Sequence, residues 1–149
     1  MRLTLTPVYR FEAHQQLEIP LFLSPGVCGF PSPADDHLEN SLDLNDLCIL
    51  HPSSTFFLRA SGSSMQPNIN QGDVLVVDKA LKAKSGDVIV ALINGEFTVK
   101  RFEKRQGRLY LTAFNPDYPP LEISEETEFQ VWGVVTYVLH QLGQRGGLR

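Results

Sequence analysis

Short apolar runs separated by turn residues fill the chain from residue 55 onward. The runs are rich in valine, isoleucine, leucine and phenylalanine, and glycine, asparagine and aspartate stand between them. Such runs are typical of β-strands. They predict strands at Thr55–Ala60, Val74–Asp78, Val88–Ile93, Glu96–Lys104, Arg108–Phe114 and Phe129–Leu139. Strands this dense, with almost no helix between them, predict a mostly β fold, namely a compact antiparallel β fold.

The connections between these strands carry their own signals. Asn94-Gly95 is the strongest hairpin signal, because a type I′ turn needs positive φ at both central positions. Gln106-Gly107 predicts a second hairpin, and residues 115–120 predict a loop. Gly133 lies inside the last predicted strand, where a glycine typically marks a bulge or bend.

The first 52 residues lack any sustained period. Prolines at positions 20, 25, 31 and 33 exclude a long helix, because proline has no backbone N–H and clashes with the preceding turn. We expect a short strand over Thr4–Tyr9. One short helical turn is predicted over Leu44–Ile49, capped by Asp43 and ending before Pro52.

These patterns divide the chain into three predicted parts. Residues 1–52 form an extended N-terminal arm, residues 53–142 a β domain and residues 143–149 a flexible tail. The apolar islands of the arm favour docking against another surface. The alternative is a disordered leader.

Composition and charge fit one domain with an arm. The chain has 149 residues, of which 42% are apolar, and its net charge is −4. Five acidic residues lie between positions 35 and 46, whereas Arg2 and Arg10 are the only basic residues before Arg59. This distribution argues against direct DNA binding by the arm.

The cysteines and apolar runs indicate a cytoplasmic protein. Cys28 and Cys48 form neither a CxxC motif nor a disulfide framework, which suits a reducing compartment. No apolar run reaches the ~18 residues of a membrane span. The N-terminus also lacks a secretory signal pattern, so we expect neither secretion nor a membrane anchor.

The segment Ala60-Ser61-Gly62-Ser63-Ser64-Met65-Gln66-Pro67 offers a nucleophile. Its small residues favour a sharp bend that presents a serine hydroxyl, and such a hydroxyl needs a neighbouring base. The histidines, at positions 14, 37, 51 and 140, lie outside the predicted strands, and their spacing indicates no pairing with an acidic residue. We expect them to be surface or packing residues, and nothing supports a Ser-His-Asp triad.

Lys100 is a second candidate base. It lies inside the predicted strand Glu96–Lys104 with apolar neighbours. Burial lowers the pKa of a lysine, so that its neutral amine can accept a serine proton, and Ser-Lys pairs are a recognised catalytic variant. The alternative is a strand lysine whose charged head lies in water. Residue type alone leaves both open.

Motifs over roughly residues 19–140 resemble one peptidase family. They are Cys28-Gly29-Phe30-Pro31-Ser32-Pro33, Asp43-Leu44-Asn45, His51-Pro52-Ser53, Ser61-Gly62-Ser63-Ser64-Met65, Gly72-Asp73, Val76-Val77-Asp78, Gly86-Asp87-Val88, Asn94–Arg101 and Trp132-Gly133-Val134-Val135. In these motifs the chain resembles the LexA/UmuD family of self-cleaving serine peptidases. Its UmuD branch, the SOS mutagenesis proteins that serve DNA polymerase V, is the most similar.

The resemblance implies a LexA/signal-peptidase-like fold and a set of site residues. Ser64 is implied as the nucleophile and Lys100 as the general base. The backbone N–H groups of Ser63 and Ser64 are implied to form the oxyanion hole, and the hydroxyl of Thr98 to hold the lysine amine. The implied cleavage site is the Cys28–Gly29 bond. Cys28 is small enough for a shallow pocket, and Gly29 allows close backbone approach.

The resemblance also implies partners. RecA–single-stranded DNA filaments are expected to promote cleavage by favouring the docked arm. The product, residues 29–149, is expected to form a homodimer and to join a UmuC-like Y-family polymerase for translesion synthesis. No metal or other cofactor is implied. Two positions depart from the UmuD pattern: residue 63 is serine instead of aspartate, and Gln66-Pro67-Asn68 is more similar to the LexA branch.

Three other functions share parts of this pattern. Signal peptidases use a related serine and lysine but need a membrane anchor. LexA-like and phage repressors carry a basic helix-turn-helix, whereas residues 1–50 are acidic and interrupted by proline. In a non-catalytic dimerising module, Ser64 and Lys100 would be structural residues and the arm would mediate oligomerisation only.

Overall fold

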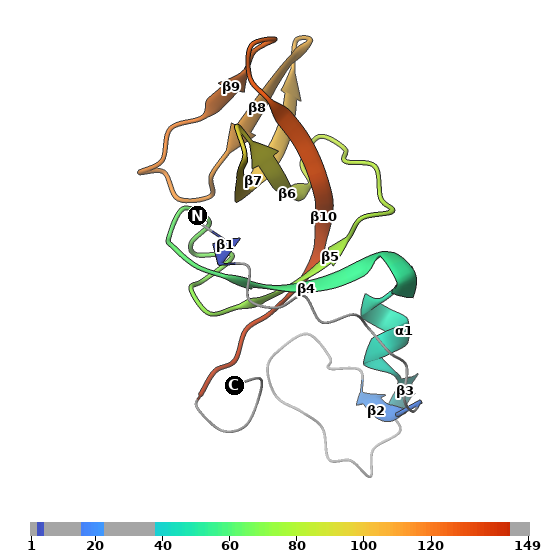
Figure 1. Ribbon diagram of the computed structural model, residues 1–149. Helices are drawn as coiled ribbons and strands as arrows, with labels where there is room; N and C mark the ends of the chain where they lie inside the picture. The colour runs from blue at the N-terminus through green and yellow to red at the C-terminus, as the bar shows by residue number, and fades with distance from the viewer. Residues whose placement is uncertain (1–2, 5–15, 23–37, 144–149) are drawn as a thin grey trace. The chain divides into compact units, whose positions relative to one another are not determined.

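A computed structural model describes residues 3–4, 16–22 and 38–143 of the chain (Figure 1). Its described residues divide into two compact units. The larger comprises residues 3–4 and 51–143, and the smaller comprises residues 16–22 and 38–50.

The larger unit is an eight-stranded antiparallel sheet. In spatial order its strands are β1 (Leu3–Thr4), β4 (Thr55–Ala60), β5 (Val74–Asp78), β10 (Phe129–Leu139), β6 (Val88–Ile93), β7 (Glu96–Arg105), β8 (Arg108–Thr112) and β9 (Leu121–Ile123). A 3-10 helix, η1 (Pro52–Ser54), precedes β4. The predicted mostly β, antiparallel fold is therefore confirmed.

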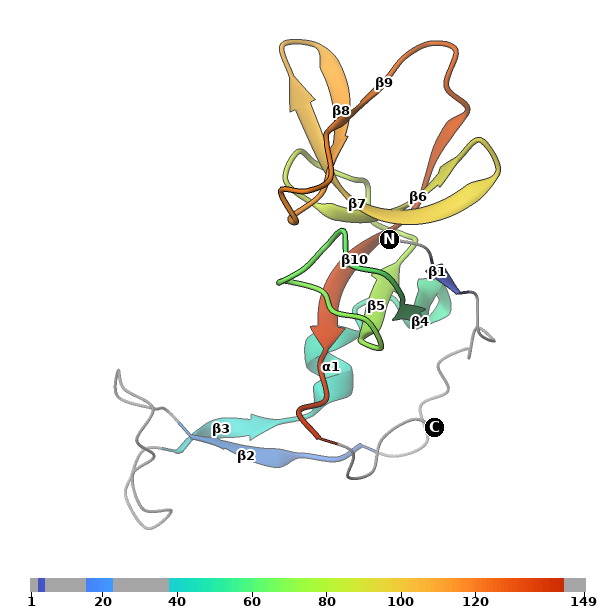
Figure 2. The ribbon, with the colours of Figure 1, turned by 90° about the vertical axis from the view of Figure 1, so that its left-hand side faces the viewer.

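The long strand β10 joins the two halves of this sheet. Its first part, Phe129–Val135, pairs with β6, and its second part, Val134–Leu139, pairs with β5. Figures 1 and 2 show β10 as a curved red strand that runs between the β6–β7–β8 part of the sheet and the β4–β5 part. The register with β6 shifts between Val131 and Gly133, which confirms the bulge predicted at this glycine.

Both predicted hairpin turns are confirmed. Asn94 and Gly95 have φ angles of 47° and 83°, and Gln106 and Gly107 have φ angles of 49° and 77°. These left-handed conformations match the twist of the flanking strands.

Two strand ends differ from the prediction, and one strand was not predicted. Strand β8 ends at Thr112, two residues before its predicted end, and β7 ends at Arg105, one residue after its predicted end. No element was predicted over β9. Strand β9 forms by pairing with β8, for example Ile123 with Leu109, and its three residues are too few to show alternation. Of the strand expected over Thr4–Tyr9, β1 covers Thr4, and residues 5–9 lie outside the described part.

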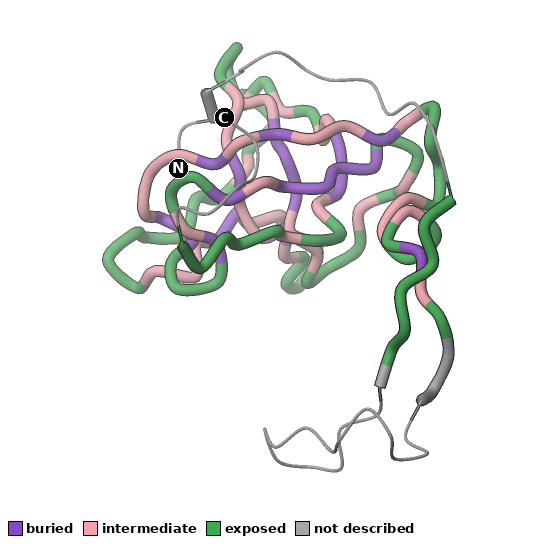
Figure 3. The backbone as a smooth tube through the Cα atoms, turned by 90° about the horizontal axis from the view of Figure 1, so that it is seen from below, coloured by how far each residue is buried: buried purple, intermediate pink, exposed green. Residues whose placement is uncertain are grey.

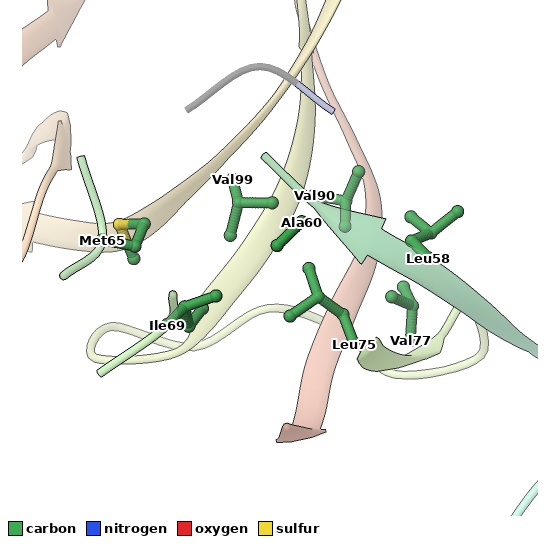
Figure 4. Packing of buried hydrophobic residues seen from close by; sticks show 8 residues of the cluster. All are labelled: Leu58, Ala60, Met65, Ile69, Leu75, Val77, Val90 and Val99. Atoms are coloured by element: carbon green, nitrogen blue, oxygen red, sulfur yellow. The ribbon is translucent and has the colours of Figure 1, made fainter. Parts of the chain in front are cut away.

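The core of the larger unit gathers side chains from four strands and one connecting segment. The buried members of this cluster are Leu58, Ala60, Met65, Ile69, Leu75, Val77, Val90 and Val99 (Figure 4). A second buried cluster comprises Ile89, Ala91, Phe102, Leu111 and Val134. Met65 and Ile69 come from the segment between β4 and β5, and neither is more than 2% exposed. The segment that carries the predicted nucleophile is thus anchored in the core on its own apolar side chains.

In the smaller unit, no apolar side chain whose burial the structure describes is buried. Strands β2 (Ile19–Phe22) and β3 (Leu38–Leu42) form a two-stranded antiparallel sheet, and helix α1 (Leu44–Cys48) follows. The Asp43 carboxylate caps α1 by accepting the Asn45 N–H at 2.8 Å, which confirms the predicted cap. Figure 3 shows mostly exposed backbone in this unit and buried stretches in the strands of the larger one. No helix among the described residues is long and apolar enough to span a membrane.

Candidate active site

The candidate nucleophile lies in the segment between β4 and β5, here called the serine loop (residues 61–73). Two backbone hydrogen bonds close its base, from Ala60 N–H to the Asp73 carbonyl and from Gly72 N–H to the Ala60 carbonyl, both 2.8 Å long. Gly62 has a φ of 91°, a left-handed conformation that permits the bend before Ser64. Ser64 is fully buried, as is its core neighbour Met65. The loop therefore holds the hydroxyl in a fixed and largely dry position.

Lys100 reaches Ser64 from strand β7. The Lys100 Nζ lies 2.9 Å from the Ser64 Oγ and donates a hydrogen bond to it. Thr98 lies on the same face of β7, because side chains two residues apart on a strand share a face. The Lys100 Nζ also donates to the Thr98 Oγ1 at 3.5 Å. The structure thus brings together three residues that the sequence analysis singled out.

The surroundings of Lys100 favour its neutral form. Burial removes water from this amine and lowers its pKa below the ordinary value. The amine lies 5.9 Å from the centre of the Tyr118 ring. A neutral amine beside a serine hydroxyl can accept the hydroxyl proton.

A loop after β8 contacts the serine loop directly. The Asn115 Nδ2 donates to the Ser63 carbonyl at 3.0 Å, and the Asn115 backbone N–H donates to the Ser64 carbonyl at 2.9 Å. The Tyr118 hydroxyl lies 2.9 Å from the Ser63 Oγ, within hydrogen-bonding distance. The sequence predicted a loop here, with no indication that Asn115 or Tyr118 belongs to the site. The two loops are about fifty positions apart in sequence, so no local signal joins them.

Two histidines form pairs that sequence reasoning did not expect. The Nδ1 atoms of His51 and His140 lie 2.6 Å from carboxylate oxygens of Asp78 and Asp73, respectively. The spacing of these residues along the sequence gave no indication of either contact. Both histidines are about half exposed, as predicted for surface residues, and both aspartates are buried.

These pairs have a clear structural role. Asp73 also accepts the Asn70 N–H at 2.8 Å, and Asp78 accepts the Ala80 N–H at 2.8 Å. The contact between His140 and Asp73 links the residue after β10 to the base of the serine loop. Each histidine Nδ1 contacts a carboxylate, whereas the Ser64 hydroxyl contacts Lys100.

The predicted cleavage site and two of the four histidines lie in parts of the chain that the structure does not describe. Cys28 and Gly29, the predicted cleavage site, and also His14 and His37 lie outside the described residues. The backbone N–H groups of Ser63 and Ser64 lie within the serine loop, and their oxyanion-hole role remains a prediction. Within residues 3–4, 16–22 and 38–143, no group of three or more histidine, cysteine or acidic side chains is arranged to hold a metal ion.

Comparisons with known proteins agree on one family. The profile of the Peptidase S24-like family matches residues 21–136. Protein SamA from Salmonella typhimurium (strain LT2) is 46% identical over 127 residues, which cover 85% of this chain and 88% of that protein. Protein MucA from Escherichia coli is 47% identical over 123 residues, which cover 81% and 84%. The LexA repressor from Shewanella sediminis is 38% identical over 118 residues, which cover 78% of this chain and 56% of the repressor.

Proposed function

This chain belongs to the Peptidase S24-like family, and on that premise we propose that it is a self-cleaving serine peptidase of the SOS response. Its proposed substrate is the Cys28–Gly29 bond, either of the same chain or of a second copy. The observation that carries this proposal is the 2.9 Å contact between the Lys100 Nζ and the Ser64 Oγ. Two such groups, both held inside a β domain, form the pair that nucleophilic peptide cleavage needs.

The proposed reaction begins with a proton transfer within this pair. Neutral Lys100 takes the Ser64 proton while the Ser64 oxygen attacks the Cys28 carbonyl carbon. The resulting oxyanion is stabilised by the backbone N–H groups of Ser63 and Ser64. The protonated amine of Lys100 then gives its proton to the nitrogen of Gly29 as the Cys28–Gly29 bond breaks.

The second half of the reaction releases the arm. Residues 1–28 remain attached to Ser64 as an ester, and residues 29–149 carry a new N-terminus. Neutral Lys100 removes a proton from water, which attacks the ester carbonyl and restores Ser64. The Thr98 hydroxyl, 3.5 Å from the Lys100 Nζ, orients the amine through both halves.

The proposed biological role follows the resemblance to UmuD-type proteins. RecA–single-stranded DNA filaments promote cleavage by favouring the state in which the arm lies at Ser64. The product, residues 29–149, forms a homodimer and serves a UmuC-like Y-family polymerase during translesion synthesis. The similarity to Protein SamA and Protein MucA over more than four fifths of this chain supports this role over that of a repressor.

The proposal is tested by weighing the products of the purified chain. We expect a fragment that begins at Gly29 after incubation at mildly alkaline pH, and faster formation of it with RecA–single-stranded DNA filaments. Ser64→Ala and Lys100→Ala should each abolish the fragment, and His51→Ala should not. If the intact mass persists under both conditions, the proposed peptidase function is wrong.

A further inference from the structure

One residue of the 115–118 loop contacts the backbone on both sides of Ser64. The Asn115 side chain donates from Nδ2 to the Ser63 carbonyl at 3.0 Å. The Asn115 backbone N–H donates to the Ser64 carbonyl at 2.9 Å. Two carbonyls that flank one residue are therefore bound by a single partner from a distant part of the chain.

These two contacts fix the orientation of two peptide planes. The Ser63–Ser64 peptide bond is trans, so the Ser63 carbonyl and the Ser64 N–H lie in one plane and point in opposite directions. A donor that holds the Ser63 carbonyl therefore also sets the direction of the Ser64 N–H. The second contact sets the plane between Ser64 and Met65. Because these two planes define φ and ψ of Ser64, Asn115 fixes the backbone conformation of this residue.

Asn115 is itself held in place. Its Oδ1 accepts the Asp117 N–H at 3.0 Å, and its backbone carbonyl accepts the Tyr118 N–H at 3.2 Å. Pro116 restricts the backbone of the residue before it to extended conformations. The hydroxyls of Tyr118 and Ser63, 2.9 Å apart, add a third contact between the two loops. The side-chain amide of Asn115 thus has little freedom to turn away from the Ser63 carbonyl.

We propose that Asn115 is a positioning residue of the peptidase, which aims the Ser64 N–H at the oxyanion and holds the Ser64 hydroxyl toward Lys100. The inference rests on the proposed function, because it concerns an oxyanion that forms only during cleavage. Donors of this kind act by being aimed before the charge develops. A misplacement of about 1 Å can lower a rate by ~100-fold, so the loss of the aiming contact should be visible in the rate.

The test compares Asn115→Ala with Asn70→Ala in the full-length chain. Asn70 is a matched control, because its Nδ2 also donates to a backbone carbonyl of the serine loop, that of Pro67 at 3.3 Å, which does not flank Ser64. The rate of self-cleavage is measured across pH, and the melting temperature is measured for each variant. We expect Asn115→Ala to lower the plateau rate by roughly 10- to 100-fold. The apparent pKa of its pH–rate profile should equal that of the parent chain. Asn70→Ala should keep the plateau rate within about twofold of the parental rate.

A second variant helps to distinguish loss of the Asn115 contact from loss of folded protein. Asn115→Asp keeps the Oδ1 acceptor for the Asp117 N–H and replaces the Nδ2 donor with a negatively charged oxygen, which repels the Ser63 carbonyl oxygen. Its plateau should fall at least as far as that of Asn115→Ala. If both Asn115 variants cleave at the parental plateau rate while Ser64→Ala is inert, the inference is wrong and the proposed function stands. The inference is also wrong if the plateau rate of each Asn115 variant falls only in proportion to the fraction of that variant that is unfolded. If Ser64→Ala still cleaves, the proposed function itself fails.

Discussion

At the scale of single residues, the amine of Lys100 lies beside a fully buried serine hydroxyl. Its own side chain is partly buried, and burial lowers its pKa. A folded-state pKa below the unfolded value means that the folded chain gives up a proton that the unfolded chain still holds. The charged amine therefore destabilises the fold at every pH below the lowered pKa. This cost fades as the pH rises toward the ordinary lysine value.

We predict that Lys100→Met increases the free energy of unfolding, and that the increase depends on pH. The gain should be largest below the lowered pKa of Lys100 and should shrink as the pH approaches about 10.5, the ordinary value. Denaturant unfolding at a series of pH values measures it. Lys104→Met is the control, because Lys104 lies on the same face of β7 and is exposed. An equal and constant gain in both variants would contradict the burial of Lys100.

Much of the residue-scale detail could not come from the sequence. Asn115 and Ser63 are 52 positions apart, and His140 and Asp73 are 67 positions apart. Such contacts form only when the sheet brings distant turns together, and no local pattern encodes them. For Lys100 itself, the residue type left both a buried base and an exposed strand lysine open, and only the motif resemblance favoured the base. The 2.9 Å contact to Ser64 now gives that choice a geometric basis.

At the scale of elements, the strands were predictable because their signals are local. Strands β4, β5, β6 and β10 have the predicted bounds, and both glycine-containing turns have the predicted positive φ angles. Strand β9 escaped prediction because pairing with β8 creates it. Gly133 in β10 packs so closely against β5 that a side chain at this position would collide with it. A Cβ on Gly133 would lie 2.5 Å from the Val77 Cγ1 and 3.5 Å from the Asp78 carbonyl oxygen.

We predict that Gly133→Ala lowers the free energy of unfolding by about 1–3 kcal/mol, because Val77 is a buried and stiff β-branched residue that cannot easily move. Chemical denaturation of the two chains measures the difference. Gly143→Ala is the matched control, since a Cβ there meets no atom within 4 Å. Equal stability of the two variants would show that the sheet relaxes around position 133 without cost.

At the scale of the whole molecule, the described part of the smaller unit leaves an apolar surface uncovered. Leu17, Ile19, Leu44, Leu47 and Leu50 are 42–67% exposed. A hollow of about 280 Å³ lies among Leu17, Ile19, Pro20, Leu21, Leu42, Asp43, Leu44 and Asn45. A two-stranded sheet with a five-residue helix cannot stabilise itself in water without further burial. We predict that the proposed homodimer covers these apolar side chains.

We predict that the double variant Leu17→Asp, Leu44→Asp weakens self-association about tenfold or more, because it places charges on this apolar surface. Sedimentation equilibrium gives the dissociation constant. Leu142→Asp is the control, because Leu142 is 95% exposed in the C-terminal region. If self-association is unchanged and cleavage slows instead, the surface serves the docking of the arm within one chain and not the dimer.

The pH dependence of self-cleavage tests the Ser64–Lys100 pair most directly. The rate should rise with pH to a plateau through a single apparent pKa that lies below about 10.5, the ordinary lysine value, because deprotonation of the buried amine creates the base. His51→Ala and His140→Ala should leave this profile in place, since both imidazoles are bound to aspartates. An inflection near pH ~6.5 that disappears in either histidine variant would contradict the account, because it would make a histidine the base and not Lys100.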